Sequence, residues 1–147
     1  MTVKEFLSQY ADAFFSVQET RKMISDLESL KSSIKSCSFS DMAGDRRKVG
    51  GNKRGFADII AEIDAKERDL RIQVNVCLAT LEMVRSTIEA VPVDVYRHVL
   101  TMRYLNRMSW ESIAHDLDYD TRYIFKICNR AFTAIMKAFP GKFEAPA

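Results

Sequence analysis

Four cationic side chains follow one another near the end of the chain with no acidic residue between them. They are Arg122, Lys126, Arg130 and Lys137. Guanidinium and ammonium groups make charge-assisted hydrogen bonds with anions such as phosphate. Acidic residues lie directly before them, at Glu111, Asp116, Asp118 and Asp120. This separation of charge indicates a basic helix that approaches an anionic surface.

Three short amphipathic helices are expected to position these cations. The predicted spans are 95–105, 110–117 and from 121 onward, with Ser109 and Asp120 as the N-caps of the second and third helices. Apolar residues recur every three or four positions in these spans and predict the faces that point inward. They are Tyr96, Val99, Leu100, Tyr104, Trp110, Ile113, Ala114, Leu117, Ile124, Ile127, Cys128, Ala131 and Ile135.

The order of residue types in the last two helices fits a helix-turn-helix. Ala114 is small enough for a helix crossing, and Ile124 and Ile127 are branched apolar residues suited to anchoring the second helix. The turn usually prefers glycine, and Asp118 there tolerates the left-handed conformation less well. The sequence therefore predicts a helix-turn-helix that binds double-stranded DNA.

The first turn of the third helix is predicted to face the base edges in a DNA groove. The residues predicted to read bases are Thr121, Arg122, Tyr123 and Lys126. Asn129 and Arg130 follow on the same helix and are predicted to lie nearer the DNA backbone.

Other interpretations of these three helices stay open. They could form a plain helical core whose surface cations are only solvated, and Arg122 could pair with Asp118 or Asp120. Phe125 falls off the inward-facing stripe. It is expected to pack against the helices that precede the three, or against a partner.

Two long stretches with apolar residues spaced alternately three and four apart come before the three helices. The first seam comprises Val3, Phe6, Tyr10, Ala13, Val17, Thr20, Ile24, Leu27 and Ile34. The second seam comprises Phe56, Ile60, Ile63, Leu70, Val74, Cys77, Leu81, Val84, Ile88 and Val91. Two seams of matched length joined by a loop predict an antiparallel helical hairpin. Sustained heptads also favour a homodimer through this hairpin.

A basic, glycine-rich loop at about 37–55 joins the two stretches. Its cations are Arg46, Arg47, Lys48, Lys53 and Arg54. They are candidates for phosphate contacts, and the alternative is a solvated linker without a binding role.

The predicted fold class is all-α, with a domain boundary after the second stretch. Pro92 disfavours helix at the residue before it, and Asp94 is the expected N-cap of the next helix. The predicted domains are the hairpin over 1–91 and the helix-turn-helix over 92–139, followed by a frayed tail over 140–147.

Composition favours a soluble protein of the cytoplasm. The chain has 147 residues, of which 47% are hydrophobic and 29% charged. No stretch approaches the roughly 20 apolar residues of a membrane span, and the first residues lack the blocks of a secretion signal.

Neither enzyme chemistry nor a bound metal or cofactor is expected. Cys37, Cys77 and Cys128 lie too far apart for a disulfide framework or a paired-cysteine zinc site, and the last two are expected in the core. His98 and His115 fall in different predicted helices. No serine, cysteine or aspartate has a recognisable activating context.

The stretch VLTMRYLNRMSWESIAHDLDYDTRYIFKICNRAF resembles the promoter-reading C-terminal domain of bacterial sigma factors. It resembles more closely the sigma-like regulators of phages and prophages, of the RinA and ArpU type. VKEFLSQYADA, SDM and AEIDAKERDL extend the similarity to a family of small Gram-positive phage and prophage proteins with a coiled front half.

The resemblance implies DNA binding in phage transcription inside a bacterial host cell. It also implies RNA polymerase as a further partner, because the equivalent sigma domain touches polymerase. The chain departs from the family pattern at Asp118, where glycine is usual, and at Asp120, where a small polar cap is usual. Both departures add negative charge near the DNA.

Two further function classes compete with transcription regulation. Small terminase subunits of phage packaging also combine a helix-turn-helix with coiled oligomerising helices, and they bind DNA as rings of many subunits. A protein-interaction module is the other class, and it would lack salt-dependent affinity for DNA.

Overall fold

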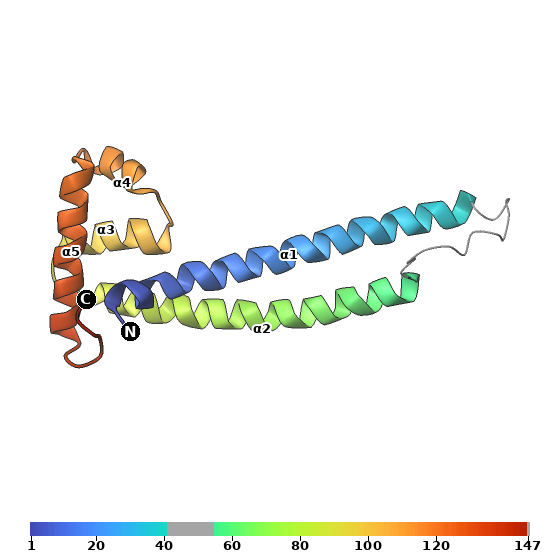
Figure 1. The fold of residues 1–147 in the computed structure, drawn as a ribbon, viewed down its shortest axis with the longest axis horizontal. Coiled ribbons are helices and arrows are strands. Elements are labelled where there is room, and N and C mark those ends of the chain that lie inside the picture. The colour runs from blue at the N-terminus through green and yellow to red at the C-terminus, as the bar shows by residue number, and fades with distance from the viewer. Residues whose placement is uncertain (41–54, 147) are drawn as a thin grey trace. The chain divides into compact units, whose positions relative to one another are not determined.

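The computed structural model describes residues 1–40 and 55–146, and these ranges are helical apart from short connections and the segment 139–146 (Figure 1). The elements are α1 (Val3–Ser40), α2 (Phe56–Glu89), α3 (Asp94–Leu100), the π-helical turn η2 (Thr101–Leu105), α4 (Trp110–Leu117) and α5 (Thr121–Ala138). The predicted all-α class is confirmed. In the described ranges, no helix has a segment long and apolar enough to cross a lipid bilayer.

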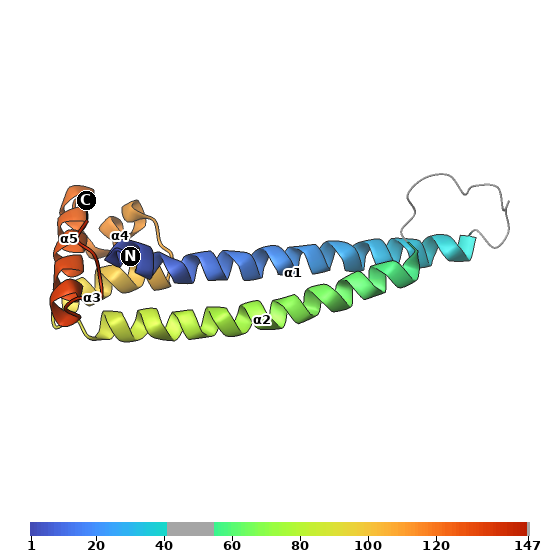
Figure 2. The ribbon, with the colours of Figure 1, turned by 60° about the horizontal axis from the view of Figure 1, so that its bottom comes forward.

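Helices α1 and α2 form the predicted antiparallel pair, and they lie side by side in both views (Figures 1 and 2). Every predicted seam position of α1 is at least partly buried. In α2 the first seam residue, Phe56, is 41% exposed, while its neighbour Ile59 is completely buried. Phe56 is the first residue of the helix.

Contacts divide the chain into two compact units. One unit comprises Ser16–Asn75, and the other comprises Met1–Phe15 together with Val76–Ala147. In the first unit Leu27, Ile59 and Ile63 form a small buried cluster. This division differs from the boundary at Pro92 that the sequence predicts.

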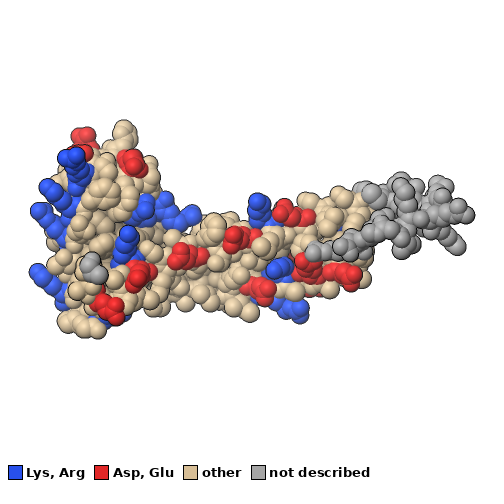
Figure 3. Space-filling model, viewed as in Figure 1, with Lys and Arg blue, Asp and Glu red and all other residues tan. Residues whose placement is uncertain are grey.

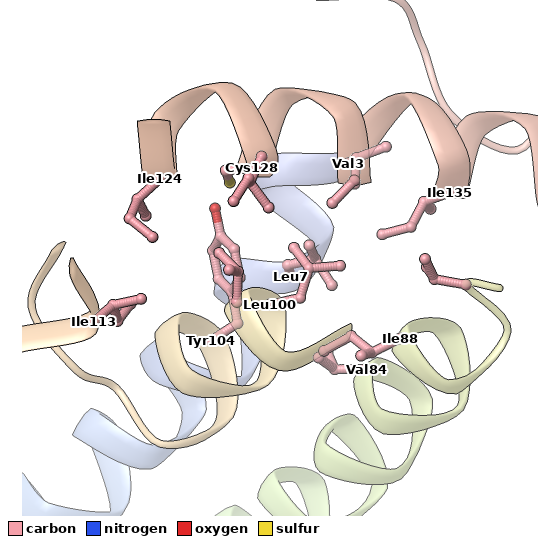
Figure 4. Packing of buried hydrophobic residues seen from close by; sticks show 14 of the residues in the cluster. Val3, Leu7, Val84, Ile88, Leu100, Tyr104, Ile113, Ile124, Cys128 and Ile135 are labelled. Atoms are coloured by element: carbon pink, nitrogen blue, oxygen red, sulfur yellow. The ribbon is translucent and has the colours of Figure 1, made fainter. Parts of the chain in front are cut away.

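The second unit has one continuous core, which explains that difference (Figure 4). The start of α1 contributes Val3, Phe6 and Leu7, and the end of α2 contributes Val84 and Ile88. They pack with the buried residues of the three shorter helices, of which α5 contacts both α3 and α4. The two long helices therefore complete the core of the region expected to bind DNA.

The segment after α5 packs against the start of α1 and is not frayed as the sequence suggested. The rings of Phe143 and Phe6 meet edge to face with centroids 5.3 Å apart. The Lys142 ammonium lies 4.9 Å from the Phe6 ring centroid and 5.1 Å from that of Phe139. Attraction between the cation and these rings adds to the apolar contact.

Helix α3 begins at Asp94, the residue that the sequence predicts as its N-cap, and so starts one residue earlier than expected. Val93 is the N-cap residue and makes no side-chain capping bond, while Asp94 is the first helical residue. The Asp94 carboxylate instead pairs with Arg97 one turn further on. Asp94 thus acts as an acidic residue in the first turn, where the helix dipole favours it.

Candidate nucleic-acid interface

The turn between α4 and α5 is short and passes through one left-handed residue. Asp118 adopts the left-handed conformation, with φ 56° and ψ 44°. The backbone N–H of Tyr119 donates to the carbonyl of Ala114 at 2.9 Å, and that of Asp118 donates to His115 at 3.2 Å. These bonds satisfy the last carbonyls of α4 and direct the chain into α5.

The two predicted caps behave differently. The Ser109 hydroxyl oxygen accepts a hydrogen bond from the backbone N–H of Ser112 at 3.2 Å, which confirms this cap. Asp120 occupies the N-cap position of α5, but its side chain makes no capping bond. The backbone carbonyl of Asp120 accepts bonds from Tyr123 and Ile124 instead.

The apolar face of α5 is fixed by burial. Ile124 and Ile127 are 0% and 2% exposed, and both pack in the core with Ala114 of α4. All the inward-facing residues predicted for the three helices are buried or partly buried. Because this face is anchored, the orientation of the opposite face of α5 is set as well.

The opposite face of α5 carries the four cations, which are named here the basic stripe: Arg122, Lys126, Arg130 and Lys137. All four are exposed. Successive members lie four, four and seven residues apart, so they follow one side of the helix over roughly 22 Å. Figure 3 shows Lys and Arg side chains gathered along the edge of the molecule formed by α5.

No member of the basic stripe forms an ion pair within the ranges 1–40 and 55–146. The proposed pairing of Arg122 with Asp118 or Asp120 is therefore not seen in this structure. Tyr123 and Asn129 are exposed beside the stripe, and Thr121 is partly buried. The structure thus brings the predicted base-facing and backbone-facing residues together on one helix surface.

Aromatic side chains flank the beginning of α5. Tyr119 and Tyr123 meet edge to face at 5.0 Å between centroids. Phe125 packs on Trp110 of α4, also at 5.0 Å. The Arg103 guanidinium lies 4.5 Å from the Trp110 ring centroid. Phe125 therefore contacts a neighbouring short helix, and the expected packing on the hairpin is wrong.

The joint between η2 and α4 contains a contact that the sequence did not indicate. Arg107 has a φ of 55°, which is unusual for a residue with a side chain. Its guanidinium lies 3.6 Å from the ring centroid of Phe14 in α1. Only the fold brings these residues together, since they are far apart in sequence.

Two grooves border the second half of α5. The hairpin-side groove, of about 640 Å³, lies between Ala90, Pro92 and Tyr96 on one wall and Arg130, Thr133 and Lys137 on the other. The tail-side groove, of about 580 Å³, is bordered by Lys4, Asn129, Thr133 and Glu144 among others. Thr133 borders both grooves, so the exposed ridge of α5 lies between them.

Two buried groups of this unit, Cys128 and Tyr104, hold their protons at neutral pH because burial raises the pKa of each. Burial raises the pKa of the Cys128 thiol to about 11 and raises that of the Tyr104 hydroxyl well above its ordinary range. Cys77 and Cys128 are buried free thiols, as expected. Within the part of the chain that the structure describes, no three His, Cys, Asp or Glu side chains are grouped to hold a metal ion.

The loop cations proposed as phosphate contacts lie outside the described residues. They are Arg46, Arg47, Lys48, Lys53 and Arg54.

No family model, curated protein or solved structure matches this chain.

Proposed function

We propose that this protein is a sequence-specific DNA-binding transcription regulator whose helix α5 enters the major groove of double-stranded DNA. One observation carries the proposal: the basic stripe occupies the exposed face of α5, directly after a left-handed turn at Asp118. An α-helix fits the major groove, where base edges present distinct donors and acceptors. A cationic face opposite an anchored apolar face suits this docking.

The first turns of α5 are the proposed reading surface. Arg122 and Lys126 are exposed there without an ion-pair partner among the described residues, so their donors are available to guanine O6 and N7. Tyr123 and Thr121 lie beside them. Asn129 and Arg130, one to two turns later, are proposed to contact the phosphate backbone.

The genes that it controls are proposed from the sequence resemblance. Similarity to sigma-like regulators supports transcription of phage or prophage genes, with RNA polymerase as a second partner. A packaging role is the competing proposal, and the assembly separates the two. A ring of many subunits is expected for packaging, whereas a monomer or dimer is expected for regulation.

A homodimer through the helical hairpin belongs to the same proposal. Val76 and Met83 lie one heptad apart on α2 and are 54% and 52% exposed. Apolar side chains that repeat every seven residues on one helix face suit a coiled contact with a second helix. A second copy would cover them.

The proposal is tested by selecting bound fragments from a library of the source genome. The wild-type protein is expected to enrich one intergenic fragment, and the Arg122→Ala/Lys126→Ala variant is expected to lose that enrichment. Each lost base contact should weaken specific binding by about 1–3 kcal/mol. An Arg21→Ala/Lys22→Ala variant removes the same charge from the exposed surface of α1 and serves as the control.

Equal enrichment by the wild type and the Arg122→Ala/Lys126→Ala variant would remove this reading surface from the proposal. Weak binding that vanishes equally for all three proteins as salt rises would show only nonspecific attraction. That result would remove sequence-specific reading from the proposal, and the absence of any salt-dependent affinity for DNA would favour the protein-interaction class.

A further inference from the structure

The two grooves beside α5 differ in charge although they are similar in volume. Among the described residues that border the hairpin-side groove, Arg130 and Lys137 are cationic and none is acidic. The tail-side groove has one lysine or arginine, Lys4, on its border, and the carboxylate of Glu144 there pairs with the Met1 amino group at 3.3 Å. An anionic chain is therefore attracted to the first groove more strongly than to the second.

The cations of the hairpin-side groove are spaced to suit a polyanion. Arg130 and Lys137 are seven residues apart on α5, which separates their backbones by roughly 10 Å along the helix axis. Neighbouring phosphates of one DNA strand lie farther apart than the axial rise of about 3.4 Å per nucleotide, because the strand winds around the axis, so two cations at this distance can contact two phosphates one or two steps apart. The opposite wall is mostly apolar, with Ala90 and Pro92, and would face the carbons of the deoxyribose rings.

We propose that the hairpin-side groove holds the sugar-phosphate backbone of one DNA strand. Arg130 and Lys137 contact its phosphates, and the Tyr96 hydroxyl donates a hydrogen bond to one of them. This inference rests on the proposed function, since α5 must bind duplex DNA. It assigns a binding role to α3 and to the joint between α2 and α3, and it fixes the flank of α5 along which the strand runs.

The experiment measures affinity for a short fluorescein-labelled duplex of mixed sequence by anisotropy over a series of KCl concentrations. Each phosphate contact that is lost should reduce the slope of log affinity against log salt by about 0.9. Lys137→Gln and Arg130→Gln are each expected to reduce the slope by this amount. Lys4→Gln, on the tail-side groove, is the matched control and is expected to keep the wild-type slope.

Tyr96→Phe separates hydrogen bonding from charge. The tyrosine hydroxyl is neutral, so its removal is expected to weaken binding at every salt concentration without changing the slope. Circular dichroism of each variant checks that the helical fold is intact.

Two results would overturn the inference, and they differ in what else they affect. If the wild-type protein shows salt-dependent binding and Lys137→Gln keeps the wild-type slope, the groove assignment is wrong while the proposed function stands. The same conclusion follows if Lys4→Gln reduces the slope as much as Lys137→Gln does. If the wild-type protein shows no salt-dependent binding, both proposals fail.

Discussion

Cys128 and Tyr104 lie against each other in the core beneath α5, and the Tyr104 hydroxyl points toward the thiol in Figure 4. Cys128 is 4% exposed, and burial is the main cause of its raised pKa. The hydrogen bond from Tyr104 lowers this pKa, but by less than burial raises it. A thiol in this state packs as a small apolar residue and is a poor nucleophile.

Ionisation of Cys128 is expected to destabilise the fold at alkaline pH. The thiol pKa is about 11 in the folded protein against an ordinary value of 9.0, so the unfolded chain loses the proton first. Stability from this group is therefore complete below pH 9 and is lost as pH rises toward 11. The free energy of unfolding should fall by up to about 3 kcal/mol over this range, measured by urea titration.

Two variants separate Cys128 from other groups. Cys128→Ala should be less stable at neutral pH because of the small cavity, but its stability should fall less between pH 9 and 11. Cys77→Ala keeps Cys128 and should retain the full decrease. The same decrease in Cys128→Ala as in the wild type would assign the effect to another group.

Single residues also show which contacts were predictable from sequence. Helical periodicity alone places Ile124 and Ile127 on one face, so the sequence predicts them in the core, where the structure has them. The contact of Arg107 with Phe14 could not be predicted in this way, because it joins segments far apart in the chain. It depends on where the whole fold places two surface positions.

At the scale of elements, the sequence predicts the features whose signals lie within one segment of the chain. The antiparallel pair, the Ser109 cap and the left-handed turn follow from heptads, a short polar side chain and a tight connection. The π-helical turn η2 has no such signal in the sequence. The segment after α5 resembled a frayed end because its aromatic anchor, Phe6, belongs to α1.

The turn between α4 and α5 is strained by its aspartate. Asp118→Gly is expected to stabilise the protein by about 1 kcal/mol, because glycine adopts the left-handed conformation without a Cβ penalty. Thermal unfolding followed by circular dichroism measures the change.

Asp116→Gly is the matched comparison, since it removes the same charge from within α4. Glycine inside a helix should instead destabilise by about 1 kcal/mol. Changes of the same sign in both variants would mean that charge, and not backbone geometry, determines the effect.

At the scale of the whole molecule, the region that carries the basic stripe depends on the hairpin. Its core includes Val3 and Leu7 of α1 and Val84 and Ile88 of α2. Helical periodicity shows that each apolar stripe is buried, but it does not show against which element. It therefore gives no sign that the start of α1 and the end of α2 pack both against each other and against the shorter helices. The sequence predicts a domain boundary at Pro92 because proline interrupts the helix there. The contacts instead group Met1–Phe15 with Val76–Ala147 in one unit.

The proposed homodimer predicts a change in mass that depends on one face of α2. Val76→Glu combined with Met83→Glu should shift the protein toward monomer in sedimentation equilibrium, because buried charges would be left unpaired. Leu78→Glu is the matched control, since Leu78 is 58% exposed and lies off the line through Val76 and Met83. A monomeric wild type, or equal weakening by Leu78→Glu, would contradict a dimer through this face.

The core that joins α1 to α5 also has a consequence during translation. Val3, Phe6 and Leu7 are synthesised before α5, yet the side chains that pack with them include Ile135 and Phe143. Contacts between residues so distant in sequence form late, after a costly loop closure. A nascent chain that has not yet exposed α5 outside the ribosome therefore leaves the start of α1 uncovered, and a chaperone has a hydrophobic segment to bind until synthesis passes Phe143.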